Sequence, residues 1–595
     1  MRCLSWCSGW GLVLLAAWPA WGQSQDLSLV YPPPNHQTTA EQIFFIGSAP
    51  PNLPVWINGQ LLERSEAGHF APVLPLRVGT NEFVIRYPHQ EIKRVVTRNL
   101  PEPLLPVTLG FAPHSWWPRQ MIARLPQELI CFTAIAPPQS QVKVHLGALS
   151  FPLAPQVTQG YLPPNAALLN GQNQPRPRVN QTYSACRRFD EPKDWGIPRF
   201  IWQRGSEKVE QESSGPLTIL DPQKAQVIAV TANLGVTRTG PSTDYSRLTP
   251  LPQGSQATVD GQEGEWLRLD YGAWIHQSET QTLPGQIPPH SQIRSVAYGV
   301  DQGVTTLRFP LQVPVPISVR QTPQQLTLTL HQVTAQTDTI RLDNDPIIES
   351  FQWQQISPQQ VQYTFQFKSE QQWGYDLHYQ GSTLVLSLRH PPSLASQGDP
   401  LQGIKILLDP GHGGSEAGAL GPTGYPEKDI NLFIAKGLAQ RLQALGAKVY
   451  LTRTKDEDVS LPERVRQINI LQPAIALSIH YNALPDGGDP NKNQGISTFW
   501  YHPQAEALAQ YLQEDLTRRL QRPAAGVYWN NLALTRPSIA PAVLLELGFM
   551  INPQEFEWIG DRQSQEKLIE ALTDSLKTWL QNKLASQSRP LERPY

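Results

Sequence analysis

The chain has 595 residues, of which 40 % are apolar and 16 % are charged, and its formal net charge is −2. At about 150 residues per domain, this length predicts about four domains. The near-neutral charge argues against a protein that binds nucleic acid, and the apolar content argues against a disordered chain. The 57 prolines indicate short strands joined by turns.

The first 22 residues read as a signal peptide. Arg2 precedes an apolar stretch from Gly9 to Ala20, and small residues at Ala20 and Gly22 predict cleavage after Gly22. An uncleaved anchor is the alternative, although the stretch is short for a membrane span of about 20 residues. No later segment is apolar enough to span a bilayer. We therefore expect an exported protein of the periplasm or cell envelope, without a transmembrane segment in the mature chain.

Two cysteines remain in the predicted mature chain, Cys131 and Cys186. Outside the cytosol they could pair as a disulfide, and the alternative is two buried thiols. Their spacing does not decide between the two.

The region before residue 225 predicts two β modules. Residues 23–105 contain short runs rich in β-formers, with a turn at Asn58-Gly59, and predict a β-sandwich. Residues 106–222 are rich in proline and predict either a further β module or a linker.

Residues 225–280 resemble a bacterial SH3-like domain. The matching segments are Val236–Tyr245, Leu251–Gly254, Glu265–Leu269 and Ala273–Ile275. The resemblance implies a small barrel that binds cell wall or peptide. The alternative for Trp266 and Trp274 is that both simply pack in the core.

Residues 290–392 alternate apolar and polar side chains with the period of a strand. Leu326, Leu328 and Leu330 share one face of such a strand. Several strands of this kind without helices predict a β-sandwich. By position and pattern, the segment looks like an envelope-targeting β domain. Residues 393–402 then read as a linker.

From residue 403 to 585, predicted strands alternate with predicted helices. This order indicates an α/β domain with a mostly parallel sheet. We expect strands at Lys405–Asp409, Ala474–His480 and Ala542–Leu547, and a helix from about Asp429. The last ten residues, 586–595, predict a disordered tail. The predicted fold class is therefore multidomain: N-terminal all-β modules (β-sandwiches and an SH3-like barrel), followed by a C-terminal α/β domain.

Four ionisable side chains fall at strand or helix ends of this domain: His412, Glu427, His480 and Glu546. Ligands gather at the carboxyl ends of strands in such a sheet, so the four should lie near one another. Two imidazoles and a carboxylate with an open position are a catalytic zinc arrangement. A second, uncoordinated carboxylate is what such a site needs to take a proton from water.

Each of these residues also has a plainer interpretation. A lone histidine at a strand end is usually a surface or core residue, and Glu427 could simply interact with a helix dipole. Glu546 is different, because burying a carboxylate after four apolar residues costs free energy unless it is paired or functional. Spacing alone does not settle the matter.

Five sequence blocks resemble the zinc-dependent N-acetylmuramoyl-L-alanine amidase family of bacterial cell walls. The blocks are Asp409–Gly414, Gly424–Asp429, Leu451–Arg453, Ser478–Ala483 and Pro541–Phe549. The resemblance covers residues 403–582. It implies that His412, Glu427 and His480 bind one zinc ion and that Glu546 is the catalytic carboxylate. Ser415-Glu416-Ala417 departs from the family, which often has an Asp-Pro pair there.

The implied reaction is hydrolysis of the amide between N-acetylmuramic acid and L-alanine in peptidoglycan. Water activated by zinc would attack, with Glu546 as general base and then acid. Only twelve residues separate Asn482 from Gly495, which leaves no room for the inhibitory helical insertion of some family members. Control would therefore come from an activator protein or another envelope component.

Two other hypotheses remain open. The same zinc site could serve a peptidase that cuts within the stem peptide. The protein could also be mainly a wall-binding scaffold with a weak or silent amidase domain.

Overall fold

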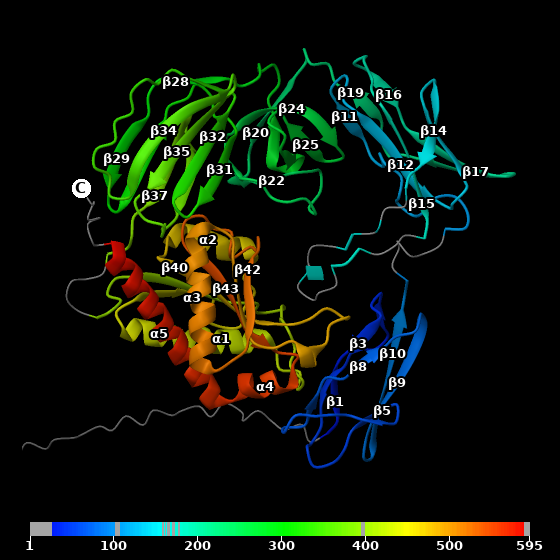
Figure 1. The fold of residues 1–595 in the computed structure, drawn as a ribbon, viewed down its shortest axis with the longest axis vertical. Coiled ribbons are helices and arrows are strands. Elements are labelled where there is room, and N and C mark those ends of the chain that lie inside the picture. Colours follow the sequence, from blue (N-terminus) through cyan, green and yellow to red (C-terminus); the bar gives the residue numbers. More distant parts are fainter. Residues whose placement is uncertain are drawn as a thin grey trace, which may run out of the picture.

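The computed structural model describes residues 26–100, 107–157, 179–393 and 399–587, with short stretches between 160 and 175. The predicted signal peptide, the middle of the predicted linker and most of the predicted tail lie outside the described residues. The chain folds into several β modules and one α/β domain (Figure 1). No helix in the described part of the chain is both long and apolar enough to cross a bilayer.

Residues 26–100 form three small sheets around one apolar core. The turn at Asn58-Gly59 joins two paired strands with φ values of 48° and 81°, as that dipeptide predicts. The sheets are, in strand order, β1 (Ser28–Tyr31), β4 (Ile46–Ser48) and β7 (His69–Phe70); β2 (His36–Thr38), β10 (Gln90–Arg98), β9 (Gly79–Tyr87), β5 (Trp56–Ile57) and β6 (Gln60–Leu61); β3 (Gln42–Phe44) and β8 (Val73–Pro75).

A six-stranded sheet follows, and it carries both cysteines. Cys131 and Cys186 lie opposite each other in neighbouring strands and form a disulfide, so the two-thiol alternative is not the one observed. The strand order is β12 (Ile130–Ala136), β15 (Gln181–Arg187), β14 (Leu149–Pro155), β13 (Gln141–Leu146), β17 (Arg199–Arg204) and β18 (Glu207–Glu212).

A nine-stranded sheet joins the segments before and after residue 225. Ile122 in β11 lies opposite Glu263 in β24, and Arg124 forms an ion pair with Glu263. The strands are β16 (Asp194–Gly196), β19 (Leu217–Ile219), β11 (Ile122–Arg124), β24 (Gln256–Glu263), β25 (Trp266–Leu269), β26 (Trp274–His276), β22 (Thr237–Arg238), β20 (Gln226–Val230) and β27 (Thr280–Thr282), beside the pair β21 (Leu234–Gly235) and β23 (Leu251–Pro252). The SH3-like assignment and the domain division stay predictions.

Residues 291–389 form two four-stranded sheets and one short pair, without a helix among these residues. Their core is continuous with that of residues 228–275. The sheets are β29 (Ala297–Asp301), β30 (Val304–Phe309), β37 (Thr383–Arg389) and β36 (Tyr375–Gln380); β31 (Ile317–Thr322), β32 (Gln325–His331), β35 (Gln360–Phe367) and β34 (Ile348–Ser357); and the pair β28 (Ser291–Ile293) and β33 (Val333–Ala335).

The C-terminal domain is α/β, and its sheet is mostly parallel, as the alternating pattern predicts. Only β41 and β42 run against the other four strands. The order is β39 (Lys448–Leu451), β38 (Lys405–Pro410), β40 (Ile475–Asn482), β43 (Ala542–Phe549), β41 (Ile496–Trp500) and β42 (Ala524–Trp529). The helices are α1 (Glu427–Ala444), α2 (Leu461–Leu471), α3 (Pro503–Leu520), α4 (Pro553–Gly560) and α5 (Arg562–Gln587).

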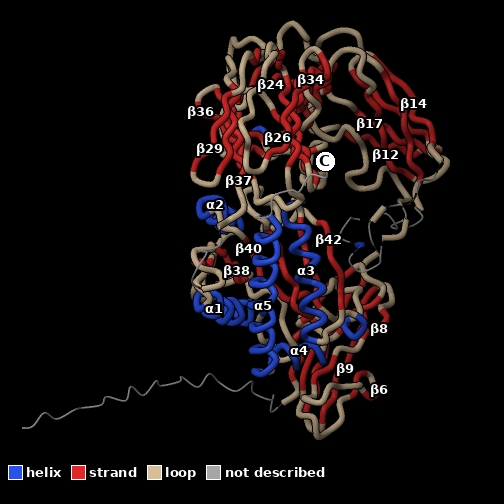
Figure 2. The backbone as a smooth tube through the Cα atoms, turned by 60° about the vertical axis from the view of Figure 1, so that its left-hand side comes forward, coloured by secondary structure: helices blue, strands red, loops and turns tan. Residues whose placement is uncertain are grey.

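Helices cover both faces of this sheet (Figure 2). The apolar sides of α1, α3 and α5 share one core with the sheet, while α2 packs in a smaller cluster on the other face. Helix α1 begins at Glu427, two residues before the predicted start. Pro426 has an extended backbone there, with φ −84° and ψ 145°, so the helix cannot extend further back.

Candidate active site

His412 lies two residues after the end of β38, the buried strand whose residues Ile406 to Leu408 are fully covered. Its φ of 58° is unusual for a residue other than glycine, and such outliers concentrate at functional sites. Two buried arginines hold this turn. Arg464 donates to the carbonyl of His412 at 2.7 Å, and Arg453 donates to that of Gly411 at 2.9 Å.

The other predicted residues come from three further elements. Glu427 is the first residue of α1, His480 lies near the end of β40, and Glu546 lies in β43. His480 and Glu546 are register partners in adjacent parallel strands, so their side chains leave the same face of the sheet. The fold thus brings all four residues to one edge.

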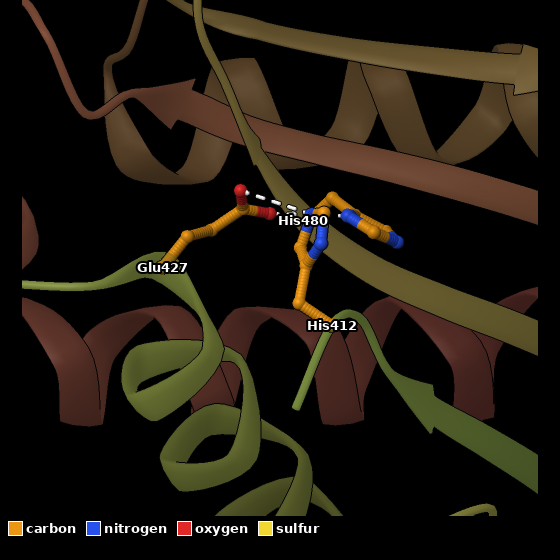
Figure 3. A group of neighbouring side chains, drawn as sticks. All are labelled: His412, Glu427 and His480. Carbon is orange, nitrogen blue, oxygen red and sulfur yellow. Dashed lines mark hydrogen bonds and ion pairs between the residues drawn. The ribbon is translucent and has the colours of Figure 1, made fainter. Parts of the chain in front are cut away.

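Three of the four side chains converge (Figure 3). His412 Nε2 lies 3.2 Å from Glu427 Oε2, and His480 Nδ1 lies 3.0 Å from Glu427 Oε1. One ligand atom from each residue lies within 4.8 Å of the others. Two imidazole nitrogens and one carboxylate oxygen are a donor set that suits a catalytic zinc ion.

The Glu427 carboxylate is fixed by the backbone and by one amide side chain. It accepts hydrogen bonds from Ala419 N at 2.8 Å, Tyr481 N at 3.0 Å and Asn431 Nδ2 at 3.1 Å. Such partners orient metal ligands. Burial opposes ionisation, but the hydrogen bonds with His412 and His480 hold the pKa of Glu427 well below its usual range. The group therefore stays an anion.

The same contact acts on His412. Its hydrogen bond with Glu427 raises the pKa of the His412 imidazole above the ordinary value, although burial works in the opposite direction. A metal ion must displace that proton, because only the neutral imidazole has a free lone pair.

Glu546 stands apart from this group. Its Oε2 atom is buried without a hydrogen-bond partner among the described residues. Burial raises the pKa of Glu546 well above that of an ordinary carboxyl group, and the nearby charge of Glu427 adds to the effect. A carboxylate oxygen without a partner is therefore found near three residues that could hold a metal, and the role of Glu546 as proton acceptor stays a prediction.

Two glycines lie so close to the site that a side chain at either position would collide with a predicted ligand. A Cβ atom at Gly411 would lie 2.1 Å from the His480 ring, and one at Gly418 would lie 2.4 Å from Glu427 Oε2. Neither position tolerates a side chain without moving a predicted ligand.

A buried ion pair supports the turn that carries His412. Asp409 and Arg464 are 2.6 Å apart with side chains only 2 % and 4 % exposed. Thr452 and Ser478 also donate to Asp409, and together these contacts hold its pKa below the usual value despite burial. Arg464 and Asn431 were not predicted, since neither lies in the five quoted blocks. For Arg464, the available signal was an arginine on the buried face of a helix.

Two further polar residues, Arg453 and Asn482, belong to the five blocks quoted above. Arg453 is 2 % exposed and donates to four backbone carbonyls, which is a structural role. Asn482 ends β40, and its Oδ1 accepts from Ala483 N. A cavity of about 730 Å³ lies elsewhere, between residues 342–391 and α5, and includes none of the four site residues.

Comparison with known proteins supports this picture. Residues 406–578 match the family model described as N-acetylmuramoyl-L-alanine amidase. The probable cell wall amidase LytH of Staphylococcus aureus is 38 % identical over 183 residues, which is 30 % of this chain and 60 % of that protein. The chain thus spans about 60 % of the length of the curated relatives it matches.

Solved structures of similar domains are also known. An N-acetylmuramoyl-L-alanine amidase from Clostridium difficile 630 is 32 % identical, with a TM-score of 0.29, over 31 % of this chain and 99 % of that one. The CwlD amidase from Clostridioides difficile, solved with the GerS lipoprotein, is 28 % identical over 30 % of this chain and 100 % of its own, with a TM-score of 0.29. Residues 406–578 of this chain therefore form an N-acetylmuramoyl-L-alanine amidase domain.

Proposed function

We propose that the protein is a peptidoglycan hydrolase, a zinc-dependent N-acetylmuramoyl-L-alanine amidase. The observation that carries this proposal is the convergence of His412, Glu427 and His480 within a domain of that family. The orphaned carboxylate of Glu546 beside them supports hydrolysis over a purely structural metal site, because structural sites need no free proton acceptor.

In this proposal each residue has one task. His412 and His480 bind the metal as neutral imidazoles, and Glu427 supplies one negative charge. A zinc ion bound there would lower the pKa of a bound water and polarise the carbonyl of the substrate. Glu546 takes a proton from the attacking water and returns it to the departing nitrogen of L-alanine. A carboxyl group whose pKa is raised by burial suits this transfer, since it must hold the proton between the two steps.

The substrate and location follow from the same assignment. Peptidoglycan lies outside the cytoplasm, so we place the protein in the periplasm or cell envelope after export. The β modules before residue 403 would bind or orient the enzyme on the wall. An activator protein is a further candidate partner, since the loop from Asn482 to Gly495 is too short for an inhibitory helix of its own.

The experiment is product analysis by mass spectrometry after residues 23–595 are incubated with purified sacculi and zinc. Free peptides that begin with L-alanine are the expected products. Glu546→Gln and a chelator-treated sample should release none. Fragments cut inside the stem peptide would instead identify a peptidase. Binding to sacculi without any product, also in the presence of zinc, would favour the scaffold hypothesis.

A further inference from the structure

The N-terminal β module, residues 26–100, lies against the C-terminal domain beside α4 (Figures 1 and 2). The module contacts three segments of that domain, which carry Glu427, His480 and Glu546. Val30 faces Gly424, three residues before Glu427. Other contacts reach Asp486, six residues after His480, and Phe549, three residues after Glu546.

The polar part of this contact centres on Asp486. Its carboxylate accepts a hydrogen bond from Tyr31 Oη, and His36 Nε2 lies 2.9 Å from its other oxygen. The next residue continues the contact, because Gln42 Nε2 donates to Gly487 O at 2.8 Å. The Asp486 side chain is 27 % exposed, so these hydrogen bonds are largely shielded from water.

The apolar part is buried. Phe44 and Ile46 of the module form a cluster with Phe549 and Ile551, and each of the four is at most 5 % exposed. Opening the contact would expose all of these side chains to water, which is unfavourable. This burial favours a stable interface over a gate.

A third set of contacts reaches α4. Ala67 N donates to Glu557 Oε1 at 2.8 Å, and the His69 ring packs edge-on against Phe556 with 5.2 Å between centroids. Asn491 Nδ2 also donates to Ala71 O at 2.9 Å. The interface is thus broad, and it runs from the loop after β40 to α4.

We propose that the N-terminal β module is a fixed part of the substrate-binding surface and that Asp486 is a positioning residue that sets the place of the module beside the site. The proposal rests on the proposed amidase function and deepens it. Peptidoglycan seated over His480 and Glu546 would border on this module, which would bind polymer beyond the amide that is cut. The module would therefore act on the affinity for long substrate and not on the chemical step.

The first test compares Asp486→Asn with a matched control, Asp343→Asn, in the full chain. Asp343 is 61 % exposed and pairs with Arg341 far along the chain from these contacts. We expect the KM for sacculi to rise about tenfold in Asp486→Asn, with little change in kcat or in turnover of a short soluble muramyl peptide. Tyr31→Phe should move KM in the same direction. An unchanged KM, or a loss confined to kcat, would contradict the proposed role of the module in substrate binding.

Binding without turnover separates this proposal from the proposed function. In a Glu546→Gln background, sedimentation with sacculi should show about tenfold weaker binding once Asp486→Asn is added. Equal binding of the two proteins would contradict the proposed role of the module, even though both proteins are inactive. A wild-type chain that released no product would contradict the amidase assignment alone.

A second test asks whether the module stays fixed during catalysis or has to open. Gln42→Cys and Gly487→Cys, joined by a short bismaleimide, would fix the module in place. Formation of the cross-link with retained activity on sacculi is the expected result, and each single cysteine variant is the control. Failure to cross-link would show that the contact is absent, and loss of activity on cross-linking would show that the module must open.

Discussion

Gly411 shows how one missing side chain shapes the site. Its backbone has no unusual φ, so the constraint is the space that the His480 ring occupies. Gly411→Ala should lower zinc affinity about 100-fold, the upper end of the effect of displacing a ligand through its surroundings. Competition with a chromophoric chelator would measure this. Gly299→Ala is the control, because a Cβ atom there meets nothing within 4 Å. Equal affinity in both variants would contradict His480 as a ligand.

His412 makes zinc binding sensitive to pH. Because Glu427 raises the pKa of His412, the imidazole is still protonated at pH values where a free one is neutral. Zinc affinity should therefore be full above this raised pKa and fall by about tenfold per pH unit below it. Calorimetric titrations between pH 6 and pH 9 would measure the curve.

A variant tests the cause of that curve. The exposed Glu416 lies 3.8 Å from His412 Nδ1 and also raises its pKa. Glu416→Gln should shift the midpoint to lower pH. A shift to higher pH, or affinity that does not depend on pH, would be inconsistent with His412 as a ligand.

The location of His412, Glu427, His480 and Glu546 at one edge of the sheet could be predicted, because each falls at a strand or helix end, while their roles rest on the family resemblance and stay predictions. Their hydrogen-bond partners could not be predicted. Asn431 reaches Glu427 from one helical turn away, and Arg464 reaches back to β38 from α2. Such contacts depend on how elements pack in space, and neither residue type nor spacing shows it.

At the scale of elements, α2 supports the turn that carries His412. Arg464→Ala would leave Asp409 as a buried charge without its partner, which costs about 3–5 kcal/mol. We expect the unfolding transition of the C-terminal domain to occur at a lower urea concentration. Arg466→Ala is the matched control, since Arg466 pairs with Glu463 on the exposed side of α2 and should leave the transition nearly unchanged. Similar shifts in both variants would refute the supporting role of the buried pair.

The helices and strands of the C-terminal domain were largely predictable, because their apolar periods are regular. At the start of α2, the Ser460 side chain accepts a hydrogen bond from Glu463 N, as serine at a helix N-cap usually does, and the Glu463 side chain binds Arg466. The β region was harder. The pairing of β11 with β24 joins residues more than a hundred positions apart, and pairing at that distance leaves no local signal.

At the scale of the molecule, the module of residues 291–389 is anchored to the C-terminal domain. Trp373 is 2 % exposed and packs against Trp579 of α5 inside the core of that domain. Trp373→Ala should lower the free energy of unfolding by about 3–5 kcal/mol, as for other buried large side chains. Calorimetry would show the C-terminal transition at lower temperature. Trp529→Ala, at a side chain 64 % exposed, should change it little, and an equal effect would argue that Trp373 does not belong to that core.

The cluster of Phe44, Ile46, Phe549 and Ile551 has a consequence for biogenesis. The first two residues are made early by the ribosome, and the last two are made about 500 residues later. Until then the module presents an apolar patch with nothing to cover it, and such surfaces associate with other chains. A chain interrupted before residue 549 would keep that patch exposed, so premature termination should yield a species that aggregates or is degraded rather than a soluble array of β modules.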